Sequence, residues 1–181
     1  MMINDKKMIA VDSAPIAANH MLSASADFGA EFSDDRKYRY ALWRIWDRTK
    51  PLAMFVGLNP STANETDNDP TIKSVGRICK HNGYGGFYMM NCFAFVSTNP
   101  DELQLETNND VNDYWLKKIA AECKTIVFAW GNFEVVKTTG RWWEMKEMFG
   151  DEAMALSVNK NGSPKHPLYC KSETMFVKWN G

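Results

Sequence analysis

No part of this sequence contains the roughly 18 consecutive apolar residues that a membrane-spanning helix needs, so we expect no membrane partner. Residues 1–12 mix polar and apolar side chains and lack the hydrophobic region of a signal peptide. Cysteine is scarce too. Neither a CxxC pair nor a Cys and His spacing typical of structural zinc occurs among Cys79, Cys92, Cys123 and Cys170. We therefore expect free thiols in a reducing compartment and a cytoplasmic protein.

An excess of charge of one sign is also missing. The chain has 21 Lys and Arg residues against 22 Asp and Glu residues, so no global basic field indicates a nucleic-acid-binding protein. Any contact with phosphate would need a local patch. The best candidate is residues 160–178, which contain four lysines and one glutamate. We expect the phosphate contacts from Lys160, Lys165 and Lys171.

Several catalytic signatures are absent: the sequence has no GxSxG elbow, Walker-type glycine loop, HExxH or GxGxxG. Asp67 and Asp69 lie close together and could bind a cation. However, Asp69 precedes a proline at the start of a helical pattern, which fits a helix N-cap better. We therefore predict no metal site and no cofactor.

Apolar residues, by contrast, make up 45% of the 181 residues, which excludes a disordered chain and predicts a sizeable core. Residues 1–30 carry small and polar side chains without a clear period, and we expect them to form a flexible N-terminal arm. Residues 31–181 are expected to form a single α/β domain.

Short apolar runs predict buried strands at 52–57, 87–90, 125–130 and 153–158. A further β segment is expected at residues 38–46, which are dense in aromatic side chains. Its two arginines, Arg39 and Arg44, are expected on the exposed face of an edge strand.

Helical patterns separate these runs. Asp69-Pro70 begins one helix and Asn82-Gly83 ends it. A second helix carries Val111, Trp115, Ile119 and Cys123 at helical spacing, a third covers 132–149 around Gly140, and a short one closes the chain at 172–179. Strands that alternate with helices indicate βαβ units. The expected fold is a three-layer α/β/α domain with a mostly parallel, four-stranded central sheet and N-terminal β additions.

Ligands of open parallel sheets bind beyond the carboxyl ends of the strands. Each expected strand is followed there by an asparagine: Asn59, Asn91, Asn132 and Asn159. A neutral amide suits the recognition of a base edge, although asparagine also caps helices and closes turns. The other residues expected to bind substrate at these strand ends are Gly57, Leu58, Pro60, Ser61 and Gly131.

The loop after the last predicted strand contains His166, followed by Pro167. A histidine between prolines on a loop is poorly placed to be a core residue, so we weigh a functional role against a plain surface position. Pro167 is expected to line the substrate site with it.

Five stretches in order, YRYALWRIW, FVGLNPSTANETDNDPTI, GFYMMNCFAF, IVFAWGN and NKNGSPKHPLY, resemble a family of bacterial and phage proteins known only as a domain of unknown function. The same order is distantly similar to the uracil-DNA glycosylase superfamily, above all its mismatch-specific branch. There a GINPG motif follows the first core strand, an Asn follows the second, and an HPS-like motif comes last. Asn59, Asn91 and His166-Pro167 stand at the matching positions, whereas Ser61 and Leu168 replace the family's glycine and serine.

This resemblance implies a uracil-DNA-glycosylase-like fold and a mechanism without a cofactor. A base flips out of the stack, Asn91 selects it, Asn59 orients water towards C1′, and His166 stabilises the negative charge on the departing base. Asn59 and His166 would be the catalytic residues.

Three functions stay open. The first is a glycosylase-like hydrolase that acts on a base in DNA or a nucleotide. The second is a non-catalytic module that binds a nucleotide or a modified base. The third is a hydrolase or transferase of a small nucleoside-like metabolite. The expected partner is therefore DNA or a nucleotide-like ligand.

Overall fold

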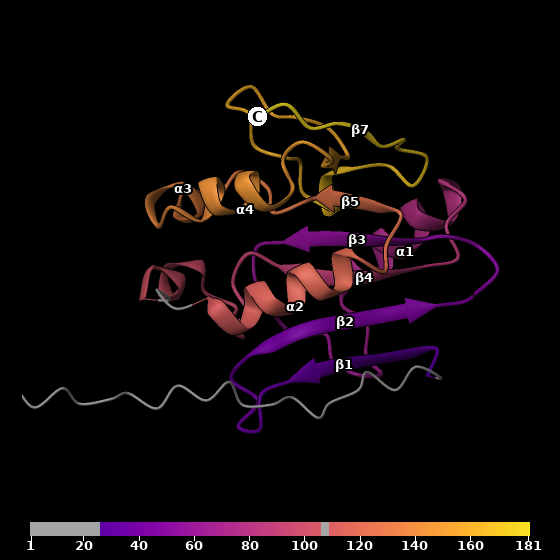
Figure 1. The fold of residues 1–181 in the computed structure, drawn as a ribbon, viewed down its shortest axis with the longest axis horizontal. Coiled ribbons are helices and arrows are strands. Elements are labelled where there is room, and N and C mark those ends of the chain that lie inside the picture. Colours follow the sequence, from indigo (N-terminus) through magenta and orange to yellow (C-terminus); the bar gives the residue numbers. More distant parts are fainter. Residues whose placement is uncertain (1–25, 106–108) are drawn as a thin grey trace, which may run out of the picture.

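The computed structural model describes residues 26–105 and 109–181, which form one mixed α/β fold around a seven-stranded sheet (Figure 1). The sheet order is β1-β2-β4-β3-β5-β6-β7. The strands are β1 (Phe28–Phe32), β2 (Arg39–Ile45), β3 (Leu52–Gly57), β4 (Gly86–Asn91), β5 (Thr125–Phe128), β6 (Met154–Ala155) and β7 (Val177–Lys178). The four neighbours β4, β3, β5 and β6 run parallel, and antiparallel strands extend the sheet on both sides. The α/β class and the N-terminal β addition are confirmed, in a sheet larger than expected.

Helices pack on both faces of this sheet. They are α1 (Pro70–His81), α2 (Asp110–Ala120), α3 (Val135–Thr138) and α4 (Arg141–Phe149), with short 3-10 helices η1 (Pro100–Leu105) and η2 (Pro167–Tyr169). The apolar residues of α1 share one buried cluster with one face of β3 and β4. Those of α2, α3 and α4 share a second cluster with the other face, and Figure 1 shows α2 crossing in front of the strands.

The limits of α1 follow from local chemistry. The Asp69 carboxylate accepts a hydrogen bond from the amide of Ile72 at 2.8 Å, and Pro70 occupies the first turn, where no amide donor is needed. At the other end Asn82 is the C-cap and Gly83 has a positive φ of 79°. The sequence prediction for this helix is confirmed at both ends.

Strand β2 differs from its prediction. It lies between β1 and β4 rather than at an edge of the sheet, and Arg39 is only 3% exposed. The expectation that Arg39 and Arg44 lie on an exposed face is therefore wrong. The loop between β3 and α1, residues 58–69, covers this side of β2 and accepts hydrogen bonds from both guanidinium groups.

The closing helix predicted at 172–179 is also wrong, because this segment contains turns and β7. Phe176 packs with the α1-side cluster, whereas Trp179 is buried in the cluster on the opposite face of the sheet. One helix face could not reach both clusters. An extended chain along the sheet edge places its side chains on alternate sides and reaches both.

Three smaller differences from the sequence prediction concern where helices and strands begin and end. Val111 is 53% exposed and Cys123 lies beyond the end of α2, so the buried stripe is Asn112, Trp115, Leu116 and Ile119. The helical stretch at 132–149 is divided into α3 and α4 at Gly140, which has a φ of 81°. The run at 153–158 contributes only the short strand β6.

Residues 28–30, assigned to the arm by sequence, belong to β1, and residues 1–25 of that arm lie outside the described residues. Among the helices in the described ranges, none is long and apolar enough to cross a membrane.

Candidate functional site

The carboxyl ends of β3, β4, β5 and β6 lie along one edge of the sheet, because these strands are parallel neighbours. Gly57 pairs with Asn91 in the register of β3 and β4. Gly131 follows β5, and its amide donates to the carbonyl of Pro164 at 3.0 Å, which brings the 159–167 loop to the same edge. The strand ends that carry the predicted residues therefore lie along one edge of the sheet, and this edge is the candidate site.

Asn91 is the last residue of β4 at this edge and is 2% exposed. A Cβ on Gly57 would lie 2.9 Å from Oδ1 of Asn91 and 2.5 Å from Cε of Met89, so a larger residue there would force these two side chains to shift. Within the described residues, Nδ2 of Asn91 has no hydrogen-bond partner. A buried donor without an acceptor is costly, and such groups in native proteins call for an explanation such as a ligand or water.

The backbone around Asn91 is held from the opposite face of the sheet. Asn112 on α2 donates from Nδ2 to the carbonyls of Asn91 and Cys92, at 3.0 and 3.1 Å. Arg141 donates from Nε to the carbonyl of Cys92 at 2.6 Å. Sequence reasoning missed both contacts, and the only available signal was that Asn112 belongs to the apolar stripe of α2.

Arg141 itself is completely buried and fully paired. Its guanidinium forms ion pairs with Asp113 and Glu144, the latter at 2.6 Å. Burial disfavours its charge, but the hydrogen bonds to the two carboxylates prevail and raise the pKa of Arg141. This arginine is a structural cation that fixes the end of β4.

Asn59 connects two loops of the site. Its Nδ2 donates to the carbonyl of Pro60 at 2.9 Å and to that of Ser97 at 2.7 Å, and so joins the β3 loop to the segment after β4. These bonds and a third to Phe95 all use Nδ2 as the donor. Leu58 and Pro60 are buried, while Ser61 is exposed. The free group of Asn59 is thus an acceptor and not a donor.

His166 lies directly before η2, with Pro167 in the first turn. Its Nδ1 accepts a hydrogen bond from the amide of Leu168 at 3.3 Å, which assigns the proton of the neutral ring to Nε2. Burial lowers the pKa of His166, and the carboxylate of Asp69 acts in the opposite direction. The ring is therefore a neutral Nε2–H donor at neutral pH.

The surroundings of His166 fix its place. A Cβ on Gly131, whose φ is 82°, would lie 3.1 Å from Cβ of His166, so the turn after β5 and the histidine loop are in close contact. Ser74 on α1 donates to the carbonyl of Pro167 at 3.0 Å. His166 is therefore held between the end of β5 and helix α1.

The remaining two asparagines bond to residues of the 159–167 loop. Asn132 is exposed and accepts a hydrogen bond from Nδ2 of Asn161. Asn159 donates to Oγ of Ser163 at 3.0 Å. Among the lysines of the predicted phosphate patch, Lys160 and Lys171 are exposed and Lys165 is half-buried.

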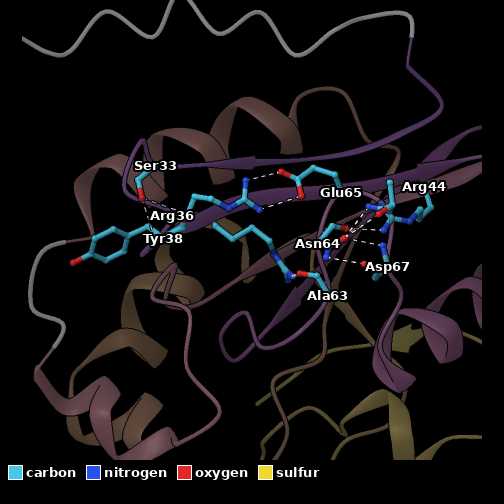
Figure 2. A network of polar contacts seen from close by, with 10 residues as sticks. Ser33, Arg36, Tyr38, Arg44, Ala63, Asn64, Glu65 and Asp67 are labelled. Atoms are coloured by element: carbon cyan, nitrogen blue, oxygen red, sulfur yellow. Dashed lines mark hydrogen bonds and ion pairs between the residues drawn. The ribbon is translucent and has the colours of Figure 1, made fainter.

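The 58–69 loop is fixed to β2 by arginines (Figure 2). Arg36 forms a bidentate pair with Glu65, at 2.7 and 3.1 Å, and Arg44 donates to the carbonyl of Asn64 at 2.9 Å. Asp67 accepts from Asn64 within the same loop, and Asp69 caps α1. In the part of the chain that the structure describes, no three His, Cys, Asp or Glu side chains are placed to hold a metal ion.

The family model described as Protein of unknown function (DUF1643) matches residues 39–168, well over half of the chain. The chain belongs to the DUF1643 family. Comparisons with curated proteins and with solved structures gave no match. The matched part of this DUF1643 domain extends from β2 to η2 and contains the candidate site from Gly57 to Pro167.

A hollow of about 350 Å³ lies elsewhere on this DUF1643 domain, near β1 and β2. It is lined by Asp27, Phe28, Arg44, Ile45, Trp46, Thr66 and Asn68. Arg44 directs its donors to protein carbonyls and to Asn68, and Asp27 pairs with Arg48 at 3.2 Å. This hollow is not at the carboxyl edge of the strands and shares no residue with the candidate site.

Proposed function

We propose that this protein recognises a nucleobase at the carboxyl edge of its parallel strands and hydrolyses the bond between the base and its sugar. The observation that carries the proposal is the geometry of His166. The Leu168 amide occupies Nδ1, so the neutral ring offers Nε2–H at the edge of the sheet.

A neutral donor is the group that this hydrolysis needs. When the C1′–N bond breaks, its electron pair stays with the base, and negative charge accumulates on the base. Nε2–H of His166 would donate to that charge, as donors of an oxyanion hole do. Water adds to the sugar C1′, and the products are the free base and a sugar with a hydroxyl at C1′.

The other strand-end residues fit roles around this step. Oδ1 of Asn59 would accept a proton of the attacking water and direct a lone pair at C1′. Nδ2 of Asn91 would donate to a carbonyl oxygen of the base. A neutral amide is a weak general base, so the rate would depend mainly on stabilisation of the leaving base.

The resemblance to the uracil-DNA glycosylase superfamily supports the same assignment. GLNPS at the end of β3, YMMN at the end of β4 and KHPLY in the loop after β6 follow one another in the order of the superfamily's three motifs. Beside His166, Leu168 is 49% exposed and Tyr169 is 75% exposed. Exposed apolar side chains at this rim would fill the space that a flipped base leaves in DNA.

A second candidate is recognition of a base without turnover. The observation in its favour is the Nδ2 group of Asn59, which donates to three protein carbonyls and so has a structural task of its own. Under this alternative, replacing His166 would weaken affinity and no free base would ever be released.

The test is release of free base from oligonucleotides that contain uracil, mismatched thymine, deaminated purines or modified pyrimidines, analysed by mass spectrometry. We expect release by the wild-type protein and a reduction by about 100-fold or more in His166→Ala. His81→Ala is the matched control, because His81 is exposed on α1. Binding of a substrate without release would favour the second candidate, and neither binding nor release would contradict both.

A further inference from the structure

The chain has two buried arginines within its described part that differ in their partners. Arg141 pairs with two carboxylates and one backbone carbonyl. Arg39 is 3% exposed, and the one hydrogen bond of its side chain to the described residues is from Nη1 to the carbonyl of Ala63 at 2.7 Å. Within the described residues, Nε of Arg39 has no hydrogen-bond partner, and no carboxylate lies within ion-pair distance. A buried cation without a counter-charge is unfavourable unless something else pairs with it.

Arg39 lies at the same edge of the sheet as the candidate site. Its backbone amide donates to the carbonyl of Ala94 at 2.8 Å, just beyond the end of β4, because β2 and β4 are antiparallel neighbours. Its guanidinium reaches Ala63, which belongs to the buried cluster on the α1 side of the sheet. Asn91 alternates with Met89 of the same cluster and so points to the same side. Two buried N–H groups without acceptors therefore occur at one edge and on one face.

The charges around Arg39 narrow the class of ligand. Burial lowers the pKa of Arg39 to about 10, with Asp69 acting to raise it and Arg44 to lower it further, so the side chain is charged at neutral pH. The Asp69 carboxylate already caps the Ile72 amide. A guanidinium with free N–H groups takes an oxygen that carries negative charge.

We infer that Arg39 binds an anionic oxygen of the ligand at the candidate site. The inference rests on the proposed function for the nature of that ligand. The oxygen is then either that of a nucleotide phosphate or a base carbonyl that takes up charge as the base leaves. Both present the same chemistry to the guanidinium, and the ligands used in the test separate them.

The need to hold the 58–69 loop in place does not explain why Arg39 is buried. Arg36 holds that loop through two hydrogen bonds to Glu65, and Arg44 holds it through Asn64 and Asn68. A neutral residue of similar shape at position 39 therefore removes one hydrogen bond to Ala63 and a buried charge together. We expect Arg39→Met to unfold at the wild-type temperature or above it when no ligand is present.

The experiment measures affinity by calorimetry and unfolding temperature with three probes: orthophosphate, deoxyuridine 5′-monophosphate and deoxyuridine. The variants are Arg39→Met and Arg39→Lys. Arg48→Met is the matched control, because Arg48 follows β2 and pairs with Asp27 at the surface. We expect wild-type affinity in the control and a loss of about tenfold or more in Arg39→Met.

The probes identify the oxygen. Binding of orthophosphate and the monophosphate, lost in Arg39→Met, assigns it to a phosphate. Equal binding of the monophosphate and the nucleoside, also lost in Arg39→Met, assigns it to the base. The inference is overturned if Arg39→Met binds like the wild-type protein, or if the wild-type protein binds no probe. In either case base release in the preceding experiment still decides the proposed function.

If Arg39→Met does not fold, Arg39→Lys decides. Lysine keeps the charge but presents fewer and differently directed donors. A loss of about tenfold in affinity at a wild-type unfolding temperature supports the inference, and unchanged affinity overturns it.

Discussion

Arg141 donates from Nε to the carbonyl oxygen of Cys92 at 2.6 Å, and so joins helix α4 to the residue that follows β4. The bond fixes the backbone next to Asn91, whose buried side chain belongs to the candidate site. Because the guanidinium is completely buried, its two carboxylate partners determine what this contact contributes to stability.

The two carboxylates should differ in their contributions. The side chain of Asp113 is 25% exposed and that of Glu144 is 50% exposed, so solvent screens the second pair more strongly. We expect Asp113→Asn to lower the free energy of unfolding by about 1–3 kcal/mol and Glu144→Gln by less than about 1 kcal/mol. Urea denaturation measures both. Equal losses in the two variants would contradict the prediction, because they would show that Asp113 stabilises the guanidinium no more than Glu144 does.

A side chain at Gly57 is expected to displace Met89 and Asn91. An added methyl group would meet Cε of Met89 at 2.5 Å and Oδ1 of Asn91 at 2.9 Å, so Gly57→Ala should cost about 1–3 kcal/mol and displace the Asn91 amide. Gly76→Ala is the control. Its Cβ would lie 3.7 Å from Phe87, an ordinary contact, and alanine favours the helix by about 0.5–1 kcal/mol. Opposite signs in thermal unfolding would confirm the pair of predictions, and a neutral Gly57→Ala would contradict the first.

His166 should make stability depend on pH. Burial lowers its pKa in the folded state below the ordinary value of 6.5, so the unfolded chain binds the extra proton first as pH falls. Its contribution to stability is complete above pH 6.5 and is lost as pH falls through the folded-state pKa. Protonation of Nδ1 also removes the hydrogen bond from the Leu168 amide that orients Nε2–H, so base release should stay constant from pH 8 to about 6.5 and decline below that range.

The control for this pH dependence is His166→Asn, which does not titrate and keeps an oxygen able to accept from the Leu168 amide. Its unfolding free energy should change less between pH 7 and pH 5 than that of the wild-type protein. An equal change in both proteins would assign the titration to other groups.

Local sequence signals predicted what depends on near neighbours. The Asp69 cap, the Asn82-Gly83 stop and the glycine that ends β3 are features of a few adjacent residues, and the structure contains each of them. Four strand-end asparagines could be placed at one edge because parallel strands share their direction.

Contacts between distant residues were not predictable in this way. Arg39 meets Ala63 24 residues along the chain, and Arg141 meets Cys92 over 49 residues. An arginine in a strand or helix is most often exposed, and nothing nearby shows that it will be buried. The prediction of a helix at 172–179 was wrong for the same reason. The helical spacing of its apolar residues could not reveal that Phe176 and Trp179 pack on opposite faces of the sheet.

Asn59 allows its structural task to be separated from its proposed catalytic one. Asn59→Asp puts a carboxylate oxygen where Nδ2 now donates to Pro60 and Ser97, at 2.9 and 2.7 Å. Repulsion between these oxygens should lower the free energy of unfolding by about 1–3 kcal/mol at pH 7, and protonation of the new carboxyl should reduce the loss near pH 4. Asn132→Asp is the control and should be nearly neutral, since Asn132 is exposed.

Asn59→Asp should lower stability without lowering the rate of base release. Aspartate keeps the acceptor that would hold the water and is a stronger base than an amide, so base release per folded Asn59→Asp molecule should equal or exceed that of the wild-type protein. Asn59→Ala lacks both groups and should lose stability and release together. A loss of release in Asn59→Asp, measured where the variant is fully folded, would place Asn59 in the scaffold alone and leave His166 as the only residue of the pair that acts on the base.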